Sequence, residues 1–305
     1  MLNFQSLAKR PMHFANFTGL SVEEAQKLVK LMEADWQRQR KESFKTDRER
    51  KIGGGRKLDV PEFADRLLVF LIYAKVYPTY LFLEYLFNID QSNICRIVQE
   101  MTPLLSATIV INRNHKRVRS LEDLREAIPD LDEVLIDATE QRINRPEKKR
   151  VRKKHHSGKK KDFTLKEQIV STKQKVILHA ADSSPGRAHD YKYFKQTGVG
   201  NWLEDNPQIK ARVDLGYQGA DKDYPKATII LPVKRTRAKK ELTRSEKIMN
   251  TKKAKARMPV ENNIANLKKF KILADKYRNL KEHYSAIFKS VCFLSNFRTL
   301  ERLPS

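Results

Sequence analysis

The chain has few cysteines and no long apolar stretch. Cys95 and Cys292 are the only two cysteines among 305 residues, and both lie in helical patterns with apolar neighbours. Two cysteines cannot build a structural zinc finger alone, so buried free thiols in a reducing compartment are expected. No apolar run reaches the roughly 18 residues that predict a transmembrane helix. Residues 1–17 also lack the basic-then-apolar layout of a secretory signal.

Acidic residues are strongly outnumbered. The sequence has 37 Asp and Glu against 62 Lys and Arg, which gives a formal net charge of +25. Such an excess indicates a polyanionic partner, either a nucleic acid or an anionic membrane surface. A basic but merely soluble protein is the alternative that charge alone leaves open.

The length predicts one large domain or two unequal ones. A chain of 305 residues exceeds the usual size of a single core, and its 40% apolar content is sufficient for a core. Helical patterns dominate the first part, and strand patterns begin near Val134. We therefore predict a helical region over residues 1–115, followed by a mixed α+β or α/β domain over residues 116–305.

Residues 62–101 have the pattern of a helix-turn-helix. Apolar residues repeat at helical spacing over 63–74, a short helix is predicted over 80–87, and Asp90 can cap a third helix that Thr102-Pro103 would close. In such motifs the N-terminal residues of the second helix of the pair contact bases in the major groove. The outward side chains suited to this role are Gln91, Ser92, Asn93 and Arg96. Many short helix pairs are only packing units, so this alternative remains open.

Three acidic residues stand at the ends or edges of predicted elements. Asp137 follows the apolar strand 134–136, Asp214 follows a strand over 209–213, and Glu261 lies on a helical pattern. Three carboxylates at contact distance repel one another strongly in a partly dry site. Hard divalent cations that prefer oxygen, such as Mg²⁺, cancel this repulsion. Two such ions would clamp the attacking and leaving oxygens of a phosphoryl displacement.

Each acid taken singly has a simpler explanation. Asp137 could cap the next turn, Asp214 could form a turn, and Glu261 could favour the dipole at a helix start. The order of the predicted elements favours a joint site. Three strands, a helix, a strand, and then a further strand and helix make the order of a ribonuclease-H-like domain, a mixed sheet flanked by helices. Its first strand lies beside its fourth, so Asp137 and Asp214 would be neighbours.

Five ordered groups of residues support this interpretation. They are Asp137-Ala138-Thr139-Glu140 with Arg145-Pro146, Ser157-Gly158-Lys159-Lys160-Lys161 with Thr164-Leu165-Lys166, Pro185-Gly186 with His189-Asp190, Asp214-Leu215-Gly216-Tyr217-Gln218-Gly219, and Arg257 with Val260-Glu261-Asn262 and Leu267-Lys268. Together they resemble the motifs of DDE transposases of bacterial insertion sequences, DDE superfamily endonucleases related to the PIF/Harbinger transposases. The resemblance covers residues 60–295, including the helix-turn-helix.

The resemblance implies a specific chemistry. By it, Asp137, Asp214 and Glu261 are the catalytic, metal-binding DDE triad. A metal-activated water would cut at the ends of the element, and the freed 3′ hydroxyl would attack target DNA. The expected cofactor is Mg²⁺, with Mn²⁺ as a substitute and two ions at the site. The expected partners are double-stranded DNA and further copies of the chain, as a homodimer or higher oligomer on DNA. The expected location is the cytoplasm of a bacterial host, at the nucleoid.

Two basic runs, residues 148–161 and 234–257, are candidates for a channel that holds phosphates. Within the first run, Lys159, Lys160 and Lys161 are expected to contact DNA. A solvated charged surface is the alternative. His155 and His156 have no cysteine nearby, so exposed polar residues or phosphate contacts are expected rather than zinc ligands. Members of the family often have aromatic residues at these two positions. This chain departs from them there, and the difference does not affect the triad.

The leading hypothesis is therefore a DNA transposase. Its helical region would bind terminal inverted repeats, and its second domain would cleave and transfer strands. A non-enzymatic helix-turn-helix regulator derived from a transposase is the alternative, and the presence of all three acids argues against it. An RNA-binding protein is a third possibility, but no RNA-recognition pattern of aromatic strand residues is visible.

Overall fold

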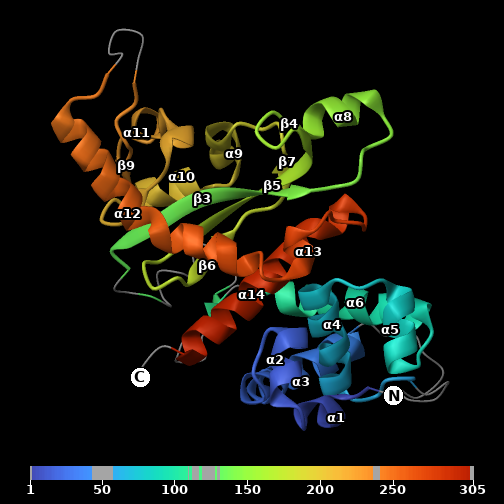
Figure 1. Ribbon diagram of the computed structural model, residues 1–305. Coiled ribbons are helices and arrows are strands. Elements are labelled where there is room, and N and C mark those ends of the chain that lie inside the picture. Colours follow the sequence, from blue (N-terminus) through green and yellow to red (C-terminus); the bar gives the residue numbers. More distant parts are fainter. Residues whose placement is uncertain are drawn as a thin grey trace. The chain divides into compact units, whose positions relative to one another are not determined.

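The computed structural model describes residues 2–42, 58–108, 131–235 and 241–302, together with 110–111, 117–118 and 128. The chain forms two compact units (Figure 1). The first is Met1–Ala107 with Lys269–Ile272, and the second is Thr108–Lys268 with Leu273–Ser305. The predicted boundary between the helical region, residues 1–115, and the second domain, residues 116–305, lies outside the described residues and stays a prediction.

The first unit is helical. Its helices are α1 (Phe4–Ala8), α2 (Pro11–Thr18), α3 (Val22–Glu42), α4 (Phe63–Val76), α5 (Tyr80–Phe87) and α6 (Gln91–Ser106). Helix α3 begins at a capping box, because the Glu24 amide donates to Ser21 Oγ at 3.1 Å and the Ser21 amide donates to Glu24 Oε2 at 2.8 Å. Helix α4 is the most deeply buried of these helices and contacts α1, α2, α3 and α6.

Helices α5 and α6 form the predicted helix-turn-helix. Asn88 takes the left-handed conformation (φ 53°) that ends α5, and Asp90 Oδ1 accepts from the Ser92 amide at 2.7 Å at the start of α6. The predicted end of the third helix at Thr102-Pro103 is wrong, because α6 continues to Ser106. A proline inside a helix removes one hydrogen bond but keeps a helical φ, and the burial of Leu104 and Leu105 favours the extra turn.

The second unit contains a mixed sheet flanked by helices. Among the described residues its strands are β3 (Glu133–Arg142), β4 (His156–Ser157), β5 (Asp162–Ser171), β6 (Ile177–Ala180), β7 (Ser184–Pro185), β8 (Lys210–Arg212) and β9 (Thr228–Ile230). The order is β4-β5-β3-β8-β9, and β6 and β7 also pair with β5. Strand β3 is antiparallel to β5 and parallel to β8. The ribonuclease-H-like order, with the first strand beside the fourth, is confirmed.

Helices cover both faces of this sheet. The helices of this unit are α8 (Lys149–His155), α9 (Asp190–Gln196), α10 (Val199–Asp205), α11 (Ala220–Asp223), α12 (Arg244–Leu267) and α14 (Tyr284–Arg302). The short helix α13 (Lys271–Ala274) begins in residues of the first unit and ends in the second, and the short strands β1 (Val110–Ile111) and β2 (Arg117–Val118) form a separate pair. Three consecutive residues of β3, Val134–Ile136, are fully buried, which requires cover on both faces. Helices α9 and α10 pack on one face, while α12 and α14 contact β3 and β6 from the other (Figure 1).

Helix α12 carries Glu261 and is longer than the sequence suggested. It begins at a capping box between Thr243 and Glu246, so Glu261 lies far from the first turn and the helix-dipole explanation for it is wrong. The buried residues of α12 all lie in its last two turns, from Val260 to Leu267. Nearer its start, the Asn250 amide side chain bonds to both backbone groups of Val233, each at 2.9 Å.

Both cysteines are free thiols, as expected. Cys292 is buried, but Cys95 is only half-buried. None of the helices in the described part of the chain combines the length and the apolar character needed to cross a membrane.

Asn296 on α14 fastens this helix to the sheet. Its Oδ1 accepts from the Ile177 amide at 2.7 Å, and its Nδ2 donates to the Ile177 carbonyl at 2.6 Å. Asn296→Ala leaves both buried groups of Ile177 unpaired and should lower the free energy of unfolding by about 2–4 kcal/mol. The exposed Asn262→Ala should change it by less than about 0.5 kcal/mol. Urea denaturation followed by circular dichroism measures both, and equal midpoints would contradict the prediction.

Candidate active site

Asp137 stands in the middle of β3, directly after the buried apolar residues. Its Oδ1 accepts from the Ala138 amide at 2.8 Å, and its Oδ2 lies 3.2 Å from Nη2 of Arg257. The pKa of the Asp137 carboxyl is raised to about 6. Burial is the main cause; the Arg257 guanidinium and the Ala138 amide oppose it, and the charges of Asp214 and Glu261 add to it.

The register of β3 and β8 brings Asp214 to the same edge of the sheet. Leu135 pairs with Arg212 in the parallel ladder; Asp137 lies two residues after Leu135 within β3, and Asp214 lies two residues after Arg212, past the end of β8. Asp214 Oδ1 accepts from the Gly216 amide at 2.7 Å and so caps the short 3₁₀ turn η1 (Leu215–Tyr217). The turn-forming role considered for Asp214 is therefore real, and it coexists with an electrostatic effect on Asp137.

Glu261 reaches the same place from α12. It is exposed and lines a pocket of about 470 Å³ together with Asp137. The structure thus gathers Asp137, Asp214 and Glu261 around one edge of the sheet. Among the described residues, however, no three His, Cys, Asp or Glu side chains lie close enough to form a ready metal-ligand set.

The unsatisfied polar groups beside these acids bear on whether a cation fits. Nε of Arg257 and Oη of Tyr217 are buried without a hydrogen-bond partner in the described structure. Tyr217 is fully buried near Asp137 and Asp214; burial raises its pKa, and the nearby carboxylates raise it further. The ligand atoms that the three acids offer to a metal ion are all carboxylate oxygens, and the Arg257 guanidinium contacts Asp137. This chemistry suits a hard divalent cation held by Asp137, Asp214 and Glu261.

A second group of charged residues, Lys166, Asp190 and Glu140, lies beside the three acids, and the sequence alone gave these residues no individual role. Lys166 Nζ lies 2.6 Å from Asp190 Oδ1, donates to the Ala188 carbonyl at 2.6 Å, and lies 3.9 Å from Glu140 Oε1. Gly216 allows Asp190 and Asp214 to approach, because a Cβ at Gly216 would lie 2.9 Å from a carboxylate oxygen of each. The signal for these residues was their place in the ordered motifs, since nothing in their local spacing predicts the pairing.

The basic residues form the rim of the pocket. Ser157 organises the turn before β5: its Oγ accepts from the Lys160 amide at 3.1 Å, and its carbonyl accepts from the Lys161 amide at 2.9 Å. Lys159 and Lys160 line the pocket, while Lys161 is exposed outside it in a left-handed conformation (φ 52°). Lys268, at the end of α12, also lines the pocket. Burial lowers the pKa of Lys268, and the charges of Lys160 and Lys159 lower it further.

The two histidines before this turn differ from the expectation. His155 is buried rather than exposed, and its Nδ1 forms a 2.9 Å hydrogen bond with the Val151 carbonyl one turn earlier in α8. His156 is exposed, and its ring meets that of Phe163 edge-on at 5.8 Å.

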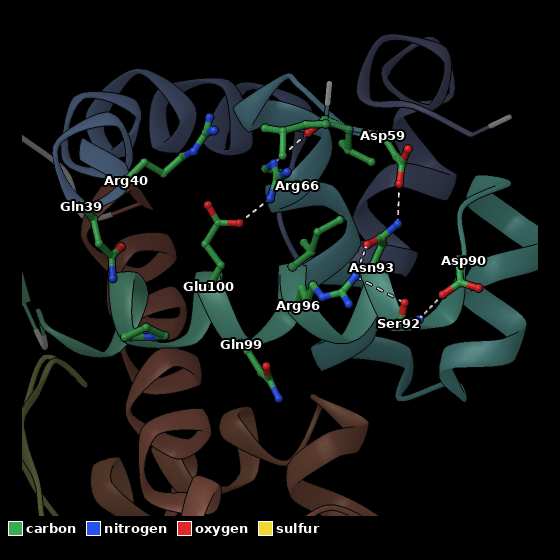
Figure 2. A pocket seen from close by; sticks show the side chains of 14 residues that line it. Gln39, Arg40, Asp59, Arg66, Asp90, Ser92, Asn93, Arg96, Gln99 and Glu100 are labelled. Carbon is green, nitrogen blue, oxygen red and sulfur yellow. Dashed lines mark hydrogen bonds and ion pairs between the residues drawn. The ribbon is translucent and has the colours of Figure 1, made fainter. Parts of the chain in front are cut away.

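The predicted base-reading residues lie in the other unit. Gln91, Ser92, Asn93 and Arg96 occupy the first turns of α6, where Asn93 is half-buried and the others are exposed. Ser92, Asn93 and Arg96 line a pocket of about 990 Å³ within the first unit (Figure 2).

The fold and the gathered acids define a ribonuclease-H-like domain of the kind found in DDE nucleases. Residues 136–296, more than half of the chain, match the family described as DDE superfamily endonuclease, and the protein belongs to that family. Residues 60–109 match the helix-turn-helix of DDE superfamily endonuclease. The predicted family and fold class are thereby confirmed, and the family implies a divalent metal ion.

A curated relative supports the same assignment. The chain is similar to the probable transposase for insertion sequence element IS702 from Microchaete diplosiphon, with 28% identity over 132 residues. The alignment covers 41% of this chain and 45% of that relative, so the chain spans less than half of the relative's length. No solved structure matches the chain.

The buried ammonium of Lys166 should matter for stability. Lys166→Met leaves Asp190 and Glu140 without their shared cation, and we expect a loss of about 2–4 kcal/mol in the free energy of unfolding. Lys195 pairs with Asp223 at the surface, so Lys195→Met is a matched control that should not shift the transition. Thermal and urea unfolding of the two variants test this. An unchanged Lys166→Met transition would show that the buried pair does not stabilise the site.

Proposed function

We propose that the protein is a DNA transposase. It binds the terminal inverted repeats of its element and performs divalent-metal-dependent strand cleavage and strand transfer. One observation carries the proposal: the acids Asp137 and Glu261 share a pocket with the lysines Lys159, Lys160 and Lys268. Carboxylates for a metal beside ammonium groups for phosphates are what phosphodiester chemistry requires.

The proposed roles follow from the contacts. Asp137, Asp214 and Glu261 hold the metal, which we propose to be two Mg²⁺ ions, with Mn²⁺ as a substitute. When bound, the metal supplies an activated water and stabilises the leaving oxygen. Arg257 favours the ionised form of Asp137 against the effect of burial. Lys159, Lys160 and Lys268 bind the DNA phosphates next to the reacting bond.

The proposed recognition of the element's ends rests on the helix-turn-helix. Gln91, Ser92 and Arg96 near the start of α6, with Asn93 among them, form the surface that contacts DNA in the way that other motifs of this class do. The partners are the element's ends and a target duplex, and the active form is a homodimer or higher oligomer on DNA. We also propose the division into a DNA-binding region, residues 1–115, and a catalytic domain, residues 116–305, acting at the nucleoid of a bacterial host.

The triad predicts that charge, and not side-chain size, is required for cutting. Glu261→Gln, Asp137→Asn and Asp214→Asn should each abolish Mg²⁺-dependent nicking of an end duplex, with folding and end binding retained. The double variant Asp214→Asn with Glu261→Gln should be scarcely worse than either single variant, because the site acts as a unit. Nicking of a labelled duplex and gel-shift binding of the same duplex are the measurements.

A distant acid provides the control for these changes. Glu282 is exposed, and Glu282→Gln should nick at the wild-type rate. Wild-type nicking by the Glu261 variant would show that the third ligand lies elsewhere. A wild-type protein that binds the ends but never nicks, with either metal, would favour a non-enzymatic regulator.

The lysines of the rim predict a defined salt dependence. Replacing Lys159 and Lys160 with Gln should reduce the slope of log affinity against log salt by about 1 for each phosphate that the protein no longer neutralises, and should weaken binding to all sequences alike. Lys175→Gln is the matched control, because Lys175 lies in the turn at the other end of β5 and should leave the slope unchanged. An unaltered slope in the Lys159 and Lys160 variant would remove this turn from the DNA footprint.

A further inference from the structure

The reading surface of α6 contains a series of hydrogen bonds that includes the acid Asp59. Asn93 Nδ2 donates to Oδ2 of Asp59, a residue that precedes α4, and Asn93 Oδ1 accepts from Nη1 of Arg96 at 2.6 Å (Figure 2). Nη1 of Arg96 also lies 3.4 Å from Ser92 Oγ. The order along the chain of contacts is therefore Asp59, Asn93 and Arg96.

The chemistry of the two neighbours fixes how the Asn93 amide is turned. The Asp59 carboxylate can only accept a hydrogen bond and therefore requires the NH₂ group. The Arg96 guanidinium can only donate and therefore requires the carbonyl oxygen. Both contacts impose the same orientation. Because an asparagine needs both of these groups to bind an adenine edge, Asn93 in this arrangement is occupied within the protein.

Arg96 keeps donors for another partner. Its side chain is exposed, and within the described residues Nε and Nη2 form no hydrogen bond. Guanidinium donors of this kind match O6 and N7 of guanine in the major groove. The helix that carries Arg96 is itself fixed, because Glu100 one turn later bonds to Arg66 of α4 and accepts from Nε1 of Trp36 on α3 at 2.7 Å.

We propose that Asp59 is a specificity-determining positioning residue: with Asn93 it holds the guanidinium of Arg96 so that Arg96 reads a guanine in the terminal repeat. The inference rests on the proposed end binding and deepens it. It replaces the expectation that Asn93 and Arg96 each read a base. The negative charge of Asp59 has a second effect, because it repels phosphates and so weakens binding to unrelated DNA.

The test uses the full chain and a library of randomised duplexes. The wild type should select a motif that contains a guanine, and Arg96→Ala should lose the preference at that base pair by about 5- to 100-fold. Asp59→Ala and Asn93→Ala should lose preference at the same base pair and at no other. The double variant Asp59→Ala with Arg96→Ala should discriminate no worse than Arg96→Ala. Replacing that guanine with 7-deazaguanine should weaken the wild type and leave Arg96→Ala unaffected.

A conservative variant separates positioning from a general structural role. In Asp59→Asn the side-chain oxygen can still accept from Asn93, so guanine preference should be retained. Its affinity for a scrambled duplex should rise as much as that of Asp59→Ala, since both remove the charge. Glu62→Ala removes an exposed acid three residues away and should keep the preference. Loss of preference in Asp59→Asn equal to that in Asp59→Ala would overturn the proposal.

Two further outcomes would also overturn it, in distinguishable ways. If Asp59→Ala leaves the selected motif intact, Asp59 does not position Arg96, although end recognition stands. The same holds if recognition of an adenine is lost in Asn93→Ala alone. If the wild-type protein selects no motif, both the proposed sequence-specific end binding and the proposed role of Asp59 are overturned.

Discussion

Strands β3 and β8 run side by side in the same direction, and the positions of the acids depend on this pairing. The parallel β3–β8 ladder ends at Leu135 and Arg212, so the residues that come two positions later, Asp137 and Asp214, lie at the same level. Slipping the register by one residue would turn a side chain such as Asp137 to the opposite face. The full burial of Val134, Leu135 and Ile136 opposes such a slip, and the hydrophobic core therefore sets the geometry of a charged site.

Once the acids are gathered, the surrounding charges decide how they can coexist. Arg257 contacts Asp137, Lys166 contacts Asp190, and the charge of Glu140 acts on Lys268 at the rim. These cations offset part of the repulsion between the carboxylates.

Local signals predicted much of this architecture. The cap at Asp90 follows from a short stretch of sequence, and the position of an acid directly after an apolar strand identified Asp137 as a candidate. The contact of Arg257 with Asp137 could not be predicted in this way, because it joins a helix to a strand 120 residues earlier, 257 − 137 = 120. The continuation of α6 past Pro103 likewise depends on tertiary burial that no local pattern records.

The two attachments of α12 bear on how far related sequences can diverge. The Asn250 side chain forms two hydrogen bonds with the backbone of Val233, and the buried turns from Val260 onward hold Glu261 next to the sheet. The residues between Val233 and Arg244 connect the sheet to the start of α12, and neither attachment involves them. Insertions or deletions in that stretch can therefore change the number of residues between Asp214 and Glu261 while the carboxylate stays in place. Distant members of the family need not share the spacing of 47 residues, 261 − 214 = 47, seen in this chain. A search that required this spacing would miss members built on the same plan.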